Sequence, residues 1–110
     1  MTKNMAFAGQ SIELLTRHCQ TLDGFSNEIT TGMAAKQPLR ITAVDVLREI
    51  VDTTQTCSSV IEFFGDDDPI PGALLDMIKT AQQAIGTASN GLILILVIAN
   101  ASVARMSKAI

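Results

Sequence analysis

Apolar residues recur at alternating spacings of three and four along three parts of this chain. The first part covers residues 12–33, the second covers residues 47–64, and the third begins at residue 78 and runs toward the C-terminal end. This spacing places the apolar side chains of each part on one face of an α-helix. The three stripes comprise, in order, Ile12, Leu15, Cys19, Leu22, Ser26, Ile29 and Met33; Leu47, Ile50, Thr54, Cys57, Ile61 and Phe64; and Ile78, Ala81, Ile85, Ala88, Leu92, Ile95, Ala99, Ser102 and Met106.

Turn and cap signals separate the three predicted helices. Pro38 is expected to end the first helix, because it biases the preceding residue away from helical geometry. Thr42 is a candidate N-cap for the second helix, and Asp45, three residues on, can complete a capping box. Gly65 is suited to end the second helix because glycine readily adopts the left-handed conformation. The connector "GDDDPIPG" then leads into a third helix that begins near Pro71.

These patterns predict a single all-α domain over residues 1–110, built as an antiparallel bundle of three long helices. The segment "GTASNG" at residues 86–91 contains two glycines and a Ser-Asn pair. Such residues favour a turn. A break of the third helix at residues 86–91 would give a bundle of four helices instead of three.

The stretch between Lys79 and Arg105 contains no charged residue, and Leu92–Ala99 within it is entirely apolar. A transmembrane helix needs about 20 predominantly apolar residues, whereas only residues 91–104 are strongly apolar here. A buried strand would have no partner strand to satisfy its backbone groups. A helix that is apolar on every side must be covered on every side. We favour this third interpretation, with a covering helix from a second chain.

A large exposed apolar patch usually marks an interaction surface. We therefore expect the C-terminal helix to bind another helix, and we expect Ile95→Asp to disrupt that association, because an unpaired buried charge is strongly disfavoured. The expected partner-binding residues are Leu92, Ile93, Ile95, Leu96, Ile98, Ala99 and Val103. Small residues that would permit close helix approach are Ala81, Ala84, Gly86, Ala88 and Gly91.

Composition and charge narrow the class of function. The chain has no Trp or Tyr, its net charge is −3, and its eight basic residues form no run, which disfavours nucleic-acid binding. It contains no phosphate-binding loop, nucleophile motif or zinc-ligand spacing. We therefore expect no enzymatic activity, no cofactor and no metal. No secretory signal is recognisable, so a cytoplasmic location is expected, with leaderless export left open.

Individual polar residues are expected to be structural. His18 lies off the apolar stripe and is expected to be solvated. Cys19 and Cys57 are expected to act as small buried residues that can face each other across the first two helices. The scattered carboxylates, Glu49 among them, form no pair suited to acid–base chemistry.

The leading expectation is a small non-enzymatic protein, of a kind found in bacteria and phages, that associates with itself or with a protein partner as a regulator, inhibitor or adaptor. A further alternative is a small single-span membrane protein that uses residues 85–104.

The first alternative to this leading expectation comes from a resemblance. The "GDDDP" connector before a long terminal helix and the ending "VARMSKAI" resemble small helical subunits of bacterial type III secretion and flagellar rod systems. The resemblance covers at most the last 45 residues, and we do not assign the chain to that family. It implies a subunit of a rod or filament whose C-terminal helix is covered by copies of itself.

Overall fold

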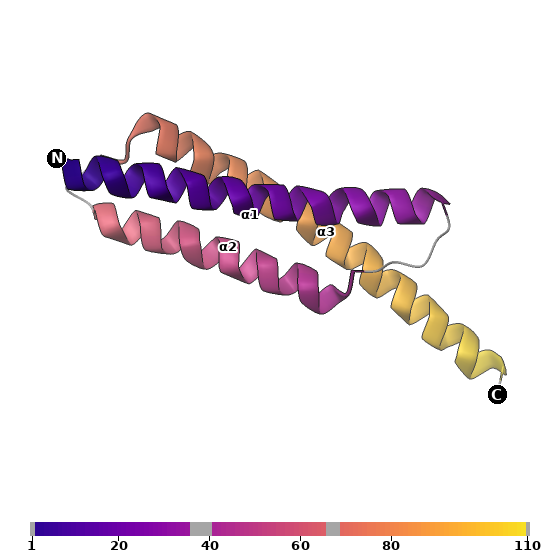
Figure 1. The fold of residues 1–110 in the computed structure, drawn as a ribbon. Coiled ribbons are helices and arrows are strands. Elements are labelled where there is room, and N and C mark those ends of the chain that lie inside the picture. Colours follow the sequence, from indigo (N-terminus) through magenta and orange to yellow (C-terminus); the bar gives the residue numbers. More distant parts are fainter. Residues whose placement is uncertain (1, 36–40, 66–68, 110) are drawn as a thin grey trace.

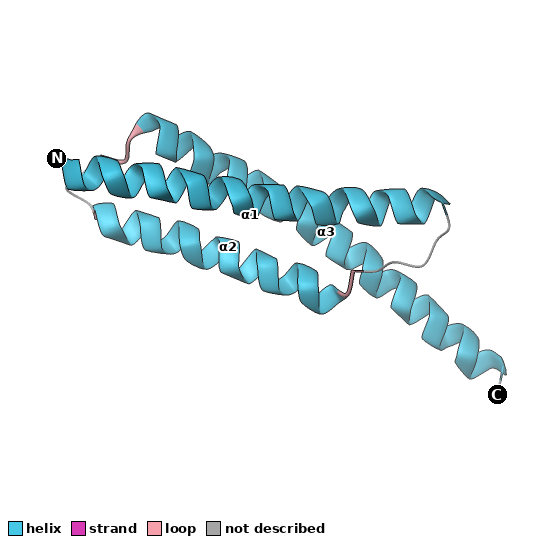
Figure 2. Ribbon diagram, in the orientation of Figure 1, coloured by secondary structure: helices cyan, strands magenta, loops and turns pink. Residues whose placement is uncertain are grey.

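The chain folds into three helices, α1 (Thr2–Ala35), α2 (Ala43–Phe64) and α3 (Gly72–Ala109), as Figures 1 and 2 show. This computed structural model describes residues 2–35, 41–65 and 69–109, and within them the side chains from Met5 to Val97. The predicted all-α bundle is confirmed. The alternative of four helices is not found, because α3 continues through residues 86–91 without interruption.

The caps of α2 are those expected from the sequence. Thr42 adopts an extended conformation, its side chain accepts a hydrogen bond from the Asp45 N–H, and the Asp45 carboxylate accepts one from the Thr42 N–H. Hydrogen bonds with Thr42 lower the pKa of the Asp45 carboxyl. The bond with the Thr42 backbone has the larger effect, and the bond with its side chain has the smaller one. Gly65 ends the helix with a φ of 64°. Pro38 and Asp66–Asp68 lie outside the described residues.

Two pairs of contacts set the directions of the helices. Thr16 of α1 lies beside Met77 of α3, and Ile29 of α1 lies beside Gly91 of α3, so residue numbers increase in the same direction along both helices. In contrast, Phe7 of α1 contacts Phe63 and Phe64, whereas His18 contacts Glu49 and Thr56. Therefore α2 runs antiparallel to α1 and α3.

The packing of α3 against α1 depends on small side chains in α3. Gly91 is buried, and a methyl group added to it would lie 3.0 Å from the Cδ1 atom of Ile29. Four of the five small residues singled out in the sequence lie in the core, and these are Ala81, Ala84, Ala88 and Gly91. On α1 the buried residues are larger and include Leu15, Leu22 and Ile29. The small side chains of α3 thus leave room for the large side chains of α1.

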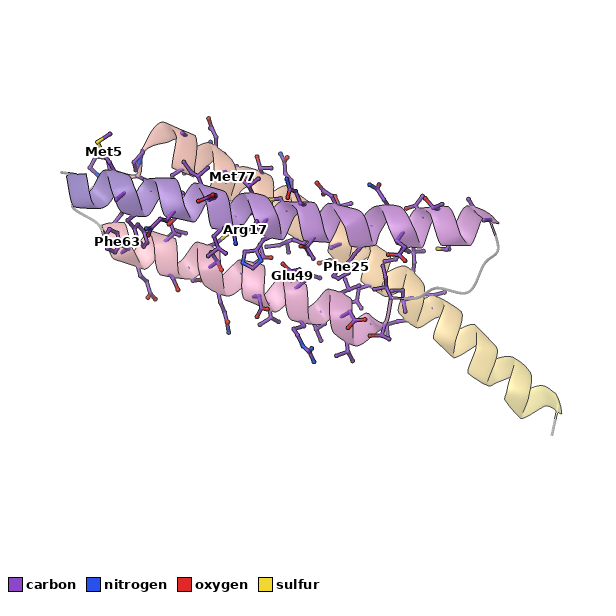
Figure 3. The ribbon with its side chains drawn as sticks, viewed as in Figure 1. Met5, Arg17, Phe25, Glu49, Phe63 and Met77 are labelled. Carbon is purple, nitrogen blue, oxygen red and sulfur yellow. The ribbon has the colours of Figure 1, made fainter. Side chains whose placement is uncertain are left out.

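An aromatic cluster closes one end of the bundle. The rings of Phe7 and Phe63 stack with centroids 3.8 Å apart, and Phe64 meets both rings edge-on, with centroid distances of 5.9 Å to Phe7 and 5.4 Å to Phe63. Met5 lies at the same end of the molecule as Phe63 (Figure 3). Edge-on aromatic pairs contribute about 0.5–1.5 kcal/mol beyond their buried area.

The other end of the bundle is open, because α2 begins too late to cover α3. Ile29 lies about three turns beyond His18 along α1. On α2, Glu49 and Thr56 lie at the level of His18. Because α2 runs antiparallel to α1, the level of Ile29 lies about three turns nearer the start of α2, at Thr42, which directly precedes that helix. At the level of Gly91, therefore, α2 is only starting. Figure 1 shows the C-terminal part of α3 extending past the other two helices.

The two glycines of the "GTASNG" segment provide a test of this packing. We expect Gly91→Val to lower the free energy of unfolding by about 1–3 kcal/mol, because the added atoms overpack the contact with Ile29. Urea unfolding followed by far-UV circular dichroism measures the change.

Gly86→Ala is the matched control in the same helix. Nothing lies within 4 Å of the position that its Cβ would occupy. We expect this variant to be more stable by up to about 1 kcal/mol, as alanine favours the helix over glycine. Equal effects of the two substitutions would contradict the close approach at Gly91.

Candidate interaction surface

The apolar run of α3 divides into a covered side and an open side. Leu92 and Ile95 are half-buried and pack against the core of their own chain. Ile93 is 57% exposed and Leu96 is 49% exposed. Leu94 is 43% exposed and Val97 is 57% exposed. We call these four exposed residues, Ile93, Leu94, Leu96 and Val97, the open segment of α3.

The predicted partner-binding residues therefore have different environments. Ile93 and Leu96 are exposed, whereas Leu92 and Ile95 contribute to the bundle. Ile95→Asp is consequently a poor test of association, because it would also destabilise the fold of the chain itself. The side chains of Ile98, Ala99 and Val103 lie outside the described residues.

The hydropathy of the helices bears on the membrane alternative. Across the residues that the structure describes, none of the three helices is both long and apolar enough to cross a membrane.

A second exposed apolar surface lies on α2. Val44, Leu47, Val51 and Ile61 are between 43% and 59% exposed. Together with the exposed Thr54 and Ser58 they repeat at spacings of three and four, and we call this set the outer stripe of α2. The predicted core stripe of α2 is partly wrong, because it combines this outer face with the core face. The buried residues of α2 are Val46, Thr53, Cys57, Val60 and Phe64.

A groove of about 500 Å³ lies between α1 and α2. Its apolar walls are Phe7, Leu14 and Val60. The remaining lining residues are polar, and they are Ser11, His18, Asp52, Gln55, Thr56 and Ser59.

His18 is not solvated, contrary to the expectation from sequence. Its side chain is 16% exposed, and its Nδ1 atom lies 2.6 Å from the Oε1 atom of Glu49, whose side chain is 19% exposed. The Nε2 atom lies 3.2 Å from the Thr56 hydroxyl. Figure 3 shows Glu49 on α2, on the side that faces α1. The expectation failed because both partners come from a helix far away in the sequence.

The order hydroxyl, imidazole, carboxylate is also the order of a nucleophilic triad. Such a site additionally needs free donors aimed at the developing oxyanion. Thr56 lies inside α2, where backbone N–H groups are bonded within the helix, and its hydroxyl also bonds the Asp52 carbonyl at 2.9 Å. The contacts of His18 with Glu49 and Thr56 join α1 to α2.

The two cysteines are both buried and both free thiols. Burial is the main cause that raises the pKa of each thiol, and for Cys19 the nearby charges of Asp23 and Cys57 raise it further. Cys57 thus lies near enough to Cys19 to influence it across the α1–α2 contact. The expectation that both residues act as small buried side chains is confirmed.

Sequence reasoning missed the outer stripe of α2 and the groove. The signal for the stripe was present, since Val44, Leu47 and Val51 repeat at spacings of three and four out of phase with the core residues. No local signal indicated the groove, because its lining residues come from two helices.

Comparison with family models, with curated proteins and with solved structures gave no match to this chain. The class that the structure defines is an all-α three-helix bundle with an exposed apolar segment in the C-terminal half of its longest helix.

The raised pKa values of the thiols predict a pH dependence of stability. An unfolded thiol has a pKa of about 8.5, so the folded chain holds these protons more tightly. The resulting stabilisation is complete below about pH 8.5 and is lost as the pH rises through the folded pKa values. We expect urea midpoints to fall as the pH rises above about 8.5, and a Cys19→Ala/Cys57→Ala variant to lose most of this slope. An unchanged slope in the variant would contradict the assignment.

The His18–Glu49 contact predicts energetic coupling. Removal of either partner leaves a largely buried polar group without its hydrogen bond, which costs about 1–3 kcal/mol. We expect a double-mutant cycle of His18→Ala and Glu49→Ala to give a coupling energy of about 0.5–3 kcal/mol in urea unfolding. His18→Ala combined with Glu28→Ala serves as a control pair, and its effects should be additive.

Proposed function

We propose that this chain is a non-enzymatic interaction protein that self-associates through the open segment of α3. The observation that supports this is the exposure of Ile93, Leu94, Leu96 and Val97 on one short stretch of helix. Large apolar patches of this kind typically mark association surfaces. The two free, buried thiols suit a reducing compartment such as the cytoplasm.

Burial of this surface favours association. Complete burial of a large aliphatic side chain contributes about 1.5–3 kcal/mol, so covering four that are already about half-buried contributes roughly 1 kcal/mol each. In a symmetric pair both copies bury such side chains, and the contribution doubles. Electrostatics adds no opposing cost here, because no charged residue occurs between Lys79 and Arg105.

Light scattering at several protein concentrations tests the proposal. We expect a mass above that of the 11.7 kDa chain, falling toward it on dilution. Ile93→Asp should shift the dissociation constant by about tenfold or more, because a charge is then placed in an apolar contact. Ile93 is more than half exposed, so the variant is expected to fold.

Met5→Asp is the matched control, since Met5 is 73% exposed and lies at the opposite end of the bundle. It should leave the mass unchanged. An oligomer of fixed size supports the regulator or adaptor type of protein. Growth without limit as concentration rises would favour the rod or filament subunit, and a requirement for mild detergent would favour the membrane alternative. A monomer at every concentration would refute self-association.

A further inference from the structure

The outer stripe of α2 and the exposed side of α3 face the same way. On α2, Glu49 and Thr56 contact α1. Residues two positions away from these point about 200° round the helix, which turns Leu47, Val51 and Ser58 away from α1. On α3, Gly91 contacts α1, and the same argument turns Ile93 away from it. Both apolar surfaces therefore lie on the side of the bundle opposite α1.

The two helix parts that carry these surfaces also have similar lengths. The outer stripe, from Val44 to Ile61, extends about 26 Å along α2. The part of α3 beyond Gly91, which ends at Ala109, extends about 27 Å. Both parts begin at the level of Gly91, because α2 starts where α3 passes that residue. From this level the two parts extend in opposite directions along the bundle, since α2 and α3 are antiparallel.

This arrangement is suited to a two-fold axis. A rotation by 180° about an axis perpendicular to the helices, at the level of Gly91, reverses the direction of α3. The C-terminal part of α3 in one copy then runs parallel to α2 of the other copy and along its outer stripe. Because the axis is two-fold, the second copy covers the first in the same way.

We propose that the open segment of α3 binds the outer stripe of α2 in a second copy of this chain, reciprocally, in a closed dimer. This inference rests on the proposed function and specifies the surface that the open segment covers. In the register that sets Ile93 beside Val44, Leu96 lies beside Leu47. All four residues are large, apolar and about half exposed or more. Each pair occurs twice in the dimer.

Charge favours this pairing over a contact between two α2 helices. The residues of α2 include Asp45, Glu49, Asp52 and Glu62 but a single basic residue, Arg48. Two outer stripes packed together would bring these acidic helices side by side. The C-terminal part of α3 carries no acidic residue, and its sequence ends with two basic residues, Arg105 and Lys108. In the proposed register Lys108 comes within about one turn of Glu62.

A charge-swap experiment tests the pairing. Leu47→Lys and Leu96→Glu are each expected to weaken the dimer by about tenfold or more, because each places a lone charge in an apolar contact. The double variant places opposite charges next to each other at both contacts. We expect it to recover a dissociation constant within about threefold of the wild type, as coupled neighbouring sites do. Sedimentation equilibrium measures the constants, and circular dichroism verifies folding.

Leu14→Lys is the control, because Leu14 is 42% exposed but lies on α1 and lines the α1–α2 groove. It should leave the dimer unchanged. A weaker dimer with Leu14→Lys, an unaffected dimer with Leu47→Lys, or a double variant that is not rescued would overturn this inference while self-association stands. A wild-type chain that stays monomeric would overturn both the inference and the proposed function.

Discussion

The close approach of α3 to α1 is the contact on which the rest of the bundle depends. On the α3 side the buried residues include Ala81, Ala84, Ala88 and Gly91, and Gly91 lies directly against Ile29 of α1. A protein interior is packed about as densely as an organic crystal, so the size of one helix's side chains determines how near the other can lie. With α1 and α3 in place, α2 adds the larger apolar residues Val46, Val60 and Phe64 from the other side.

This arrangement explains why some apolar residues are buried and others are exposed. The shortest helix, α2, can pair with only part of α1 and α3, and α3 is left with an exposed apolar segment beyond the start of α2. In addition, α2 carries more apolar residues than two neighbours can cover, so part of them lie on its outer face. Both exposed surfaces thus result from three helices of unequal length and an apolar content of 47%.

The features that sequence predicted well are local ones. The capping box of Thr42 and Asp45 involves residues three apart, and the stripe of α1 depends only on the helical period. The continuity of α3 through Gly86 and Gly91 was not predictable in this way, because burial of Gly91 against Ile29 outweighs the low helix propensity of glycine. The environment of His18 depends on where α2 lies, and so does the difference in exposure between Ile93 and Ile95. No local sequence pattern predicts the position of α2 relative to the other helices.

The two ends of the bundle differ in how firmly they hold the chain. At one end, Phe7, Phe63 and Phe64 tie α1 to α2 through three ring contacts. At the other, Ile93, Leu94, Leu96 and Val97 of α3 are exposed. Local opening costs least where buried apolar contacts are few. Opening of the folded chain therefore costs least at the end opposite the aromatic cluster.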